Sequence, residues 1–405
     1  MISASEAFAL IQSRAVPLPP VVLPLEVLGG KVLAEDVLAP AGMPPFAQAG
    51  MDGYAVAWRA TGPEATRGGA SGPEATRDGA PGLTIRGEVP AGHAPTFVVA
   101  PGEAVRIFTG AMLPPGTDTV VMQERVRVEG DRLYIEDPAL TKGAYVRAPG
   151  SDIAAGALAL PKGTLLGPAS IGLLAGLGLD QALVHPKPRV NLITTGNELQ
   201  VPGRPLPPGQ VYESNSFALR AALGKVTYYT APDEPEALKK IIAEALAFTD
   251  VLLLTGGVSV GDYDIVGEAL AACGVTRVFH GVRQRPGKPF YFGMRDQQLV
   301  FGLPGNPSSV LTCFYLYVLP ALERLGGRME SAPVRLPLAE PYHKAPGLTH
   351  FLKGRADATH ATPLSAQESY RMSSYALANC LIRLPEEGSD FAPGDLVDVY
   401  RLPYL

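Results

Sequence analysis

The sequence has few of the features that mark a secreted or nucleic-acid-binding protein. Only three of its 405 residues are cysteines, and Cys273, Cys313 and Cys380 form no CxxC pair and have no neighbouring histidine at metal-ligand spacing. Scattered thiols are typical of a reducing compartment, so we expect buried structural cysteines in a cytoplasmic protein. Charged residues make up 18% of the chain and the net charge is −5, so no basic field is available for nucleic acid.

Long hydrophobic runs are also missing. The 45 glycines and 40 prolines interrupt every apolar stretch, well short of the about 20 residues that a membrane-spanning helix needs. The first residues, Met1 to Glu6, lack a basic region followed by an apolar core, so we expect no secretory signal and no membrane partner. With 46% apolar residues, the chain is expected to form two to four globular domains.

Hydrophobic patterning predicts a multidomain fold of the α/β plus β class. Strand and helix patterns alternate between Arg189 and Leu325, which is typical of a doubly wound, mostly parallel sheet. Short strands with Gly and Pro turns predict a small inserted β domain and a C-terminal β-barrel-like domain. The predicted boundaries are 1–45 with 146–180 for a discontinuous N-terminal domain, 46–145 for the insertion, 181–328 for the α/β domain and 329–405 for the C-terminal domain.

A short duplication lies inside the inserted domain. Residues 62–67, Gly-Pro-Glu-Ala-Thr-Arg, recur as residues 72–77. Two copies are too few for a repeat fold, and the composition is that of a surface connection. Deletion of residues 62–79 is therefore expected to leave activity intact.

Three loops rich in glycine or proline follow strand patterns of the α/β region. Glycines in such loops allow positive φ and a close approach of backbone N–H groups to a ligand. Because the carboxyl ends of parallel strands meet at one edge of a sheet, we expect the loops to line a single anion-binding site. The expected contacts are Thr255, Gly256, Gly257 and Ser259 in the first loop, Arg285 and Lys288 in the second, and Pro304, Gly305, Asn306 and Ser309 in the third.

Six motifs occur in order along the chain. They are Met51-Asp-Gly-Tyr-Ala-Val, Arg106-Ile-Phe-Thr-Gly-Ala, Thr195-Gly-Asn-Glu-Leu, Thr255-Gly-Gly-Val-Ser-Val-Gly-Asp, Pro286-Gly-Lys-Pro and Gly302-Leu-Pro-Gly-Asn-Pro. Together they resemble the MoeA family, the bacterial molybdopterin molybdenumtransferases, to which the E domain of animal gephyrin is related. The resemblance implies four domains, a homodimer, Mg²⁺ as cofactor, and insertion of molybdate into adenylated molybdopterin with release of AMP. It also implies the molybdopterin adenylyltransferase as a partner.

The resemblance assigns catalytic roles to acids and one threonine. They are Asp52, Thr109, Asp152, Glu198, Asp233 and Asp264. The residues themselves leave structural alternatives open: Asp52 precedes Gly53 in a turn pattern, Thr109 can bond its own backbone, and Asp233 can begin a helix. Asp152 can equally cap a turn, and Glu198 can be solvated.

The implied substrates bring several negative charges together, since molybdate is a dianion and the adenylated pterin carries a pyrophosphate. At about 4 Å, each pair of unit charges repels by roughly 4 kcal/mol in a surface-like dielectric. The groups expected to offset this repulsion are the cations of Arg283, Arg285, Lys288 and Lys353, with the hydroxyls of Ser309 and Ser369. The carboxylates of Glu198, Asp233 and Asp264 are oxygen ligands suited to Mg²⁺, so these three are the expected metal ligands.

The chain departs from the family pattern at three places. Residues 280–283 read His-Gly-Val-Arg where bacterial relatives often have Lys at Gly281, so Arg283 is expected to supply that cation. Lys353 stands where relatives often have Arg, and an ammonium lacks the bidentate geometry of a guanidinium. Residues 46–49, Phe-Ala-Gln-Ala, replace a Phe-Asp-x-Ser pattern and weaken any role for that segment.

Two other functions remain open at this point. A molybdopterin adenylyltransferase would share only the segment from Arg189 to Leu325, so the additional domains oppose it. A non-enzymatic scaffold of the gephyrin kind would carry a further partner-binding domain. Release of AMP from adenylated molybdopterin with molybdate and Mg²⁺, and no reaction of ATP with molybdopterin, separates all three.

Overall fold

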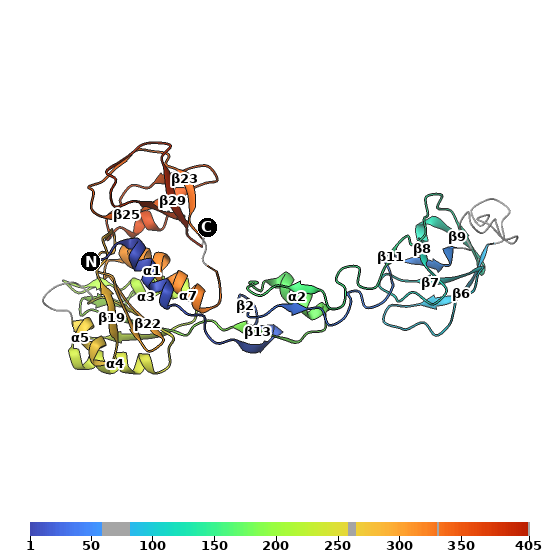
Figure 1. The fold of residues 1–405 in the computed structure, drawn as a ribbon, viewed down its shortest axis with the longest axis horizontal. Coiled ribbons are helices and arrows are strands. Elements are labelled where there is room, and N and C mark those ends of the chain that lie inside the picture. The colour runs from blue at the N-terminus through green and yellow to red at the C-terminus, as the bar shows by residue number, and fades with distance from the viewer. Residues whose placement is uncertain (59–81, 258–264, 330–331, 404–405) are drawn as a thin grey trace. The chain divides into compact units, whose positions relative to one another are not determined.

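The computed structural model describes residues 1–58, 82–257, 265–329 and 332–403 (Figure 1). The chain packs into two compact units: unit 1 comprises Met1–Val22, Gly30–Ala34 and Leu183–Leu405, and unit 2 comprises Leu23–Gly29 and Glu35–Ala182. The duplicated segment at 62–79 and the predicted site residues Ser259 and Asp264 lie outside the described residues. In the part of the chain that is described, no helix has the length and apolar character needed to cross a membrane.

Unit 1 is built around a six-stranded sheet of order β17-β14-β18-β22-β21-β19. Its strands are β14 (Val190–Thr195), β17 (Thr227–Ala231), β18 (Val251–Thr255), β19 (Thr276–His280), β21 (Tyr291–Arg295) and β22 (Gln298–Leu303). The first four strands in the spatial order are parallel, and β21 runs antiparallel to both of its neighbours, β22 and β19. The predicted α/β plus β fold class is confirmed, with a sheet that is mostly but not wholly parallel.

Helices cover both faces of this sheet (Figure 1). They are α1 (Ala4–Arg14), α3 (Asn215–Leu223), α4 (Pro235–Ala247), α5 (Ile265–Ala272), α6 (Pro307–Cys313) and α7 (Leu319–Leu325). Alternate strand residues point to opposite faces, so Leu192 and Leu253 pack with α1, α3 and α6, whereas Ile193 and Leu254 pack with α4 and α5.

The helix predicted from Pro307 to Leu325 is interrupted. Pro307 does occupy the first turn of α6, after Asn306 at the N-cap. A π-helical segment, Phe314–Val318, then separates α6 from α7, whose first turn contains Pro320. Proline lacks the N–H that would continue an α-helical hydrogen-bond ladder, which accounts for the change of geometry before it.

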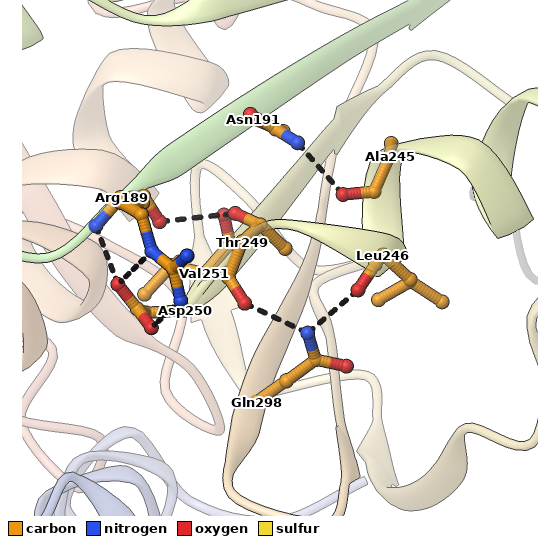
Figure 2. Close-up of polar contacts among 8 residues, drawn as sticks. All are labelled: Arg189, Asn191, Ala245, Leu246, Thr249, Asp250, Val251 and Gln298. Carbon is orange, nitrogen blue, oxygen red and sulfur yellow. Dashed lines mark hydrogen bonds and ion pairs between the residues drawn. The ribbon is translucent and has the colours of Figure 1, made fainter.

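Polar contacts fasten the amino-terminal edge of the sheet (Figure 2). Arg189 forms a bidentate ion pair with Asp250, at 3.1 and 2.9 Å. Gln298 donates from Nε2 to the carbonyls of Leu246 and Thr249, both at 2.7 Å. These contacts link the starts of β14, β18 and β22, three parallel neighbours whose carboxyl ends lie at the opposite edge.

The C-terminal part of unit 1 closes into a small barrel. Its strands are β20 (Gln284–Arg285), β23 (Val334–Pro337), β25 (Thr349–Ala356), β26 (Ala361–Pro363), β27 (Cys380–Leu384) and β29 (Leu396–Arg401). The sheet runs β20-β25-β27-β29-β23 with β26 beside β25, and a bridge between Leu338 and Ala361 joins its two sides. The interior contains Leu336, Leu352 and Ile382, all buried. A short helix, α8 (Met372–Tyr375), and a hairpin of β24 (Tyr342–His343) and β28 (Asp390–Phe391) complete this part.

Unit 2 contains a second six-stranded sheet of order β8-β5-β7-β6-β10-β9. Its strands are β5 (Gly53–Val56), β6 (Leu83–Val89), β7 (Glu103–Ile107), β8 (Thr119–Met122), β9 (Val126–Glu129) and β10 (Arg132–Ile135). Unit 2 also holds α2 (Pro168–Gly176), the turns η1 (Leu25–Val27) and η5 (Gln123–Arg125), and two pairs of strands, β3 (Val37–Leu38) with β12 (Leu158–Leu160) and β4 (Gln48–Ala49) with β11 (Val146–Arg147).

The remaining strands are short. They are β1 (Val21–Pro24), β2 (Val32–Leu33) and β13 (Gln181–His185), which form one sheet, and β15 (Leu199–Gln200) with β16 (Val211–Tyr212), which form another.

Candidate functional site

A cleft of about 970 Å³ opens at the carboxyl edge of the unit 1 sheet. Residues from all three predicted loops line it, together with residues from the loop that precedes α8. The predicted site residues along the cleft are Glu198, Gly257, Arg285, Lys288, Pro304, Gly305, Asn306, Ser309 and Ser369. The structure therefore brings together the loops that sequence patterning assigned to one edge.

The second loop supplies the cationic side of the cleft. Arg285 and Lys288 are exposed, while Pro286 and Gly287 between them are buried. Both cations line the cavity, and among the described residues neither has a carboxylate within ion-pair distance. Unpaired cations in a concave site attract anions more strongly than the same charges paired on a convex surface.

The first loop follows β18 and requires glycine. Gly256 has φ +94°, and a Cβ atom there would lie 2.1 Å from the carbonyl oxygen of Thr195. Gly257 has φ +65°, and its Cβ would lie 2.8 Å from Val266 Cγ2. Backbone in this left-handed region can turn N–H groups toward a ligand, and only glycine does so here without a collision.

The third loop joins the sheet to the C-terminal part of unit 1. Asn306 Nδ2 donates to Ser369 Oγ at 3.0 Å, and the Ser308 N–H donates to the Ser369 carbonyl at 3.1 Å. The Asn306 side chain therefore bonds Ser369 and does not cap the N-terminus of α6. Ser309, on the first turn of α6, is 3% exposed and lines the cleft.

Asn215 is a site residue that sequence reasoning missed. Its Nδ2 donates to Thr255 Oγ1 at 3.0 Å and to the Gly305 carbonyl at 2.9 Å, so it ties the first loop to the third. Thr255 itself is buried and donates to the Pro304 carbonyl at 3.3 Å. The available signal was the position of Asn215 in a Glu-Ser-Asn-Ser run at a helix start, where Glu213 accepts from the Ser216 N–H at 2.7 Å.

Two of the predicted metal ligands line a smaller pocket of about 260 Å³, which shares Glu198 and Gly257 with the cleft. Asp233 accepts from Thr195 Oγ1 at 2.6 Å and from the Asn197 N–H at 3.0 Å, so both of its oxygens are oriented. The Glu198 carboxylate lies against Gly196, where a Cβ would come within 2.7 Å of it. Within the described ranges, which do not include Asp264, no three His, Cys, Asp or Glu residues are grouped so that they could hold a metal ion.

Arg283 and Lys353 are placed differently from the prediction, since neither lines the cleft. Arg283 donates from Nε to Glu386 at 2.6 Å and from Nη1 to the Met1 carbonyl at 3.1 Å. Lys353 is 2% exposed, and burial lowers the pKa of its ammonium. Its Nζ donates to the carbonyls of residues 366, 368 and 371, at 2.7, 3.2 and 3.0 Å. Lys353 thus bonds neighbouring backbone, and Arg283 bonds the Glu386 carboxylate and the Met1 carbonyl.

Three predicted catalytic residues belong to unit 2. Asp52 and Thr109 lie together at the end of β7, where Thr109 donates to the Asp52 carboxylate. The hydrogen bonds from the Thr109 hydroxyl and backbone N–H hold the pKa of Asp52 below its usual value. Asp152 is exposed in a turn, and its N–H donates to the Met43 carbonyl at 3.0 Å.

Comparison with protein-family models gives matches along nearly the whole chain. Residues 2–178 match the MoeA N-terminal region (domain I and II), residues 191–324 match a probable molybdopterin binding domain, and residues 335–402 match the MoeA C-terminal region (domain IV). The matches at both ends of the chain separate it from proteins that contain the central domain alone.

Sequence similarity to known proteins covers most of the chain. A molybdopterin molybdenumtransferase of Nostoc is 34% identical over 379 residues, which is 91% of this chain and 80% of that protein. A molybdopterin molybdenumtransferase of Staphylococcus aureus is 32% identical over 98% of this chain and 95% of that protein. The crystal structure of a molybdopterin biosynthesis MoeA protein from Pyrococcus horikoshii has a TM-score of 0.78 and 32% identity, covering 99% of both chains.

Proposed function

Because the chain belongs to the MoeA family and is a transferase of molybdenum cofactor biosynthesis, we propose that its cleft holds adenylated molybdopterin beside molybdate and releases AMP as molybdate is inserted. Adenylated molybdopterin brings a pyrophosphate and molybdate is a dianion, so the site must accommodate closely spaced negative charge. The cleft must therefore supply positive charge and hydrogen-bond donors for these anions.

One observation carries the proposal. Arg285 and Lys288 project from either side of the buried Pro286–Gly287 turn into the same cleft as Gly257 and Asn306, with no ion-pair partner in the described part of the chain. Oxyanions of molybdate or pyrophosphate would occupy the space between these cations, and the Ser309 hydroxyl supplies a neutral donor. An arginine adds two parallel N–H donors, and a lysine adds a compact charge.

Glu198 and Asp233 fit a hard divalent cation. Both are carboxylates that line one small pocket next to the cleft, and the hydrogen bonds from Thr195 and Asn197 fix the orientation of Asp233. Oriented outer contacts of this kind are typical of metal ligands. We propose that these two residues hold Mg²⁺, with Asp264 as the third ligand that the sequence predicts. When bound, Mg²⁺ supplies positive charge beside the pyrophosphate and the departing AMP.

The proposal is tested by following AMP. Purified protein with adenylated molybdopterin, molybdate and Mg²⁺ should release AMP, and omission of molybdate should stop the release. Loss of either cation in Arg285→Gln or Lys288→Gln should weaken molybdate binding by about tenfold or more, since a charge-assisted hydrogen bond contributes about 1.5–3 kcal/mol. Lys240→Gln, at an exposed position on α4 away from the cleft, is the matched control. Normal molybdate binding in both cleft variants would remove the proposal.

The oligomeric state and the protein partner are proposed on the family resemblance alone. We propose a homodimer that receives its substrate from the molybdopterin adenylyltransferase, and a cytoplasmic location. The location is supported by Cys273, Cys313 and Cys380, all of which are free thiols. Light scattering during size-exclusion chromatography tests the dimer, and a mass of about 42.5 kDa would contradict it.

A further inference from the structure

A buried polar network lies directly beneath the cationic loop. Gln284 is 1% exposed, and the two atoms of its side-chain amide serve different neighbours. Nε2 donates to the Pro286 carbonyl at 3.1 Å and toward the Gly287 carbonyl at 3.4 Å, while Oε1 accepts a hydrogen bond from the Tyr317 hydroxyl. A fully buried amide in this arrangement fixes the backbone that it contacts, because leaving any of these groups unpaired is costly.

We propose that Gln284, held by Tyr317, is a positioning residue that aims Arg285 and Lys288 into the cleft. This inference rests on the oxyanion-binding role proposed above for those two cations. The carbonyls of Pro286 and Gly287 turn inward toward Gln284, and the side chains on either side of that turn are the exposed cations. Gln284 lies along the wall of the cleft, but its side-chain amide is bonded to the loop carbonyls and to Tyr317, so it acts through the loop.

The helix that follows the third loop also contacts the cationic loop and Gln284. Ser309, Cys313 and Tyr317 are spaced by four residues, so they lie along one face of α6 and the π-helical segment after it. Ser309 lines the cleft, Cys313 lies against Gly287, and Tyr317 holds Gln284. One helix face therefore sets the position of the serine hydroxyl relative to both cations.

Tyr317 is itself firmly placed. It is 1% exposed, and its ring stacks on Phe290 with centroids 4.9 Å apart. Burial raises the pKa of its hydroxyl well above the usual value, so the hydroxyl stays a donor across the working pH range. Its hydrogen bond to Gln284 fixes which end of the amide faces the loop, since Oε1 is occupied and only Nε2 is left to reach the carbonyls.

The test compares Tyr317→Phe and Gln284→Met with Tyr375→Phe. Tyr317→Phe removes one hydroxyl, and Gln284→Met keeps side-chain length and burial without hydrogen bonds. Tyr375 is a matched control because it is a buried tyrosine of the same unit whose hydroxyl is next to Thr312 and lies outside the Gln284 network. Molybdate binding is measured by calorimetry, and kcat and KM for molybdate are measured from AMP release, alongside thermal unfolding.

Tyr317→Phe is expected to bind molybdate about tenfold more weakly, in line with the loss of one buried hydrogen bond. Gln284→Met should weaken binding at least as much, because it loses the bonds to Pro286, Gly287 and Tyr317. Both variants should raise KM for molybdate more than they lower kcat, whereas Tyr375→Phe should leave both unchanged. A network that only stabilises the fold would lower the melting temperature with unaltered molybdate affinity, which would overturn the inference alone. Absence of molybdate binding by the unsubstituted protein would overturn the proposed function and this inference together.

Discussion

Thr109 donates both its backbone N–H and its hydroxyl to the same carboxylate oxygen of Asp52, each at 2.7 Å. Asp52 directly precedes β5 and Thr109 follows β7, so this pair joins the ends of two antiparallel strands. The family resemblance gives both residues catalytic roles, and the residue pattern alone allows a turn. Because these hydrogen bonds hold a turn, a structural role of Asp52 can be measured by thermal unfolding and a catalytic role by AMP release.

Replacing Asp52 with Ala should destabilise unit 2, because the Thr109 donors lose their acceptor. The Asn variant keeps an acceptor oxygen and should melt close to the unsubstituted protein at pH 7. The folded pKa of Asp52 is lowered, chiefly by the Thr109 hydroxyl. The stabilisation is therefore complete above the unfolded pKa of about 3.9 and is lost as pH falls through the folded value.

Thermal unfolding of the three proteins between pH 3 and pH 7 checks this expectation. If the negative charge of Asp52 is needed for catalysis, Asp52→Asn should lose AMP release without any change of melting temperature. Identical melting of the Ala variant and the unsubstituted protein would contradict the turn interpretation.

Arg283→Ala should affect stability and leave molybdate affinity within about twofold. Arg283 pairs with Glu386 and with the Met1 carbonyl, so the variant loses these two side-chain contacts, while the backbone hydrogen bonds of Ile2 with Gly281 and Arg283 remain. The Arg283 side chain is 39% exposed, and partly exposed ion pairs contribute about 1 kcal/mol or less. Urea unfolding and molybdate calorimetry measure the two effects, with Arg285→Ala expected to show the reverse pattern.

Lys353→Met should be strongly destabilising, by about 2–5 kcal/mol. The ammonium is the shared donor for three backbone carbonyls of the segment from Ala366 to Arg371, and its removal leaves buried acceptors unpaired. The same segment carries Ser369, so weaker binding of substrate should accompany the loss of stability. A stable variant with normal urea unfolding would show that the carbonyls find other partners.

Arg283 and Lys353 illustrate which parts of the site can be predicted from the sequence and which cannot. The first and third loops were predictable because they follow β18 and β22, parallel strands whose carboxyl ends meet at one edge. The second loop reaches the same edge for another reason, since it precedes the antiparallel strand β21. Arg283 and Lys353 were not predictable, because a cation serves a ligand or a fold depending on its neighbours. The partner of Arg283 lies 103 residues away at Glu386, and nothing in the local sequence identifies it. Asn215 was missed for the same reason, since its partners Thr255 and Gly305 lie on two other loops.

His350 should make the protein less stable as pH falls from about 6.5 toward 4. Burial, then the charges of Lys344 and Arg285, lower its pKa from 6.5 to about 4. Between those values the unfolded chain binds a proton that the folded chain does not, so the free energy of unfolding decreases with falling pH. The slope for one such proton is at most about 1.4 kcal/mol per pH unit. Below the folded pKa both states are protonated and the slope disappears.

Urea unfolding at pH 7, 6 and 5 measures this slope. His350→Gln removes the titrating group from the pairing position opposite Arg285 and should flatten the dependence over this range. Other acid-sensitive groups remain in both proteins, so the difference between the two slopes isolates His350. Parallel slopes would mean that the folded imidazole takes up its proton as easily as the unfolded one.

Gly287→Ala tests the contact between the cationic loop and the helix beneath it. Gly287 has φ +90°, and a Cβ there would lie 2.5 Å from Cys313 Sγ. Two costs are expected, about 1–2 kcal/mol for the left-handed backbone and about 1–3 kcal/mol for overpacking. Gly274→Ala separates them, because Gly274 has φ +82° and no atom within 4 Å of the added methyl, so it should show the backbone cost alone.

Cys313→Ala should remove part of the second cost and none of the first, because Gln284 Nε2 would still lie 2.8 Å from the added Cβ. In a double-mutant cycle measured by urea unfolding, Gly287→Ala and Cys313→Ala should therefore couple favourably, by about 1–3 kcal/mol, because the contact that each changes is shared. The same double variant should recover part of the molybdate affinity that Gly287→Ala loses, since Arg285 and Lys288 are attached to that turn. Additive effects of the two substitutions on stability would mean that the loop rests on something other than the Cys313 sulfur.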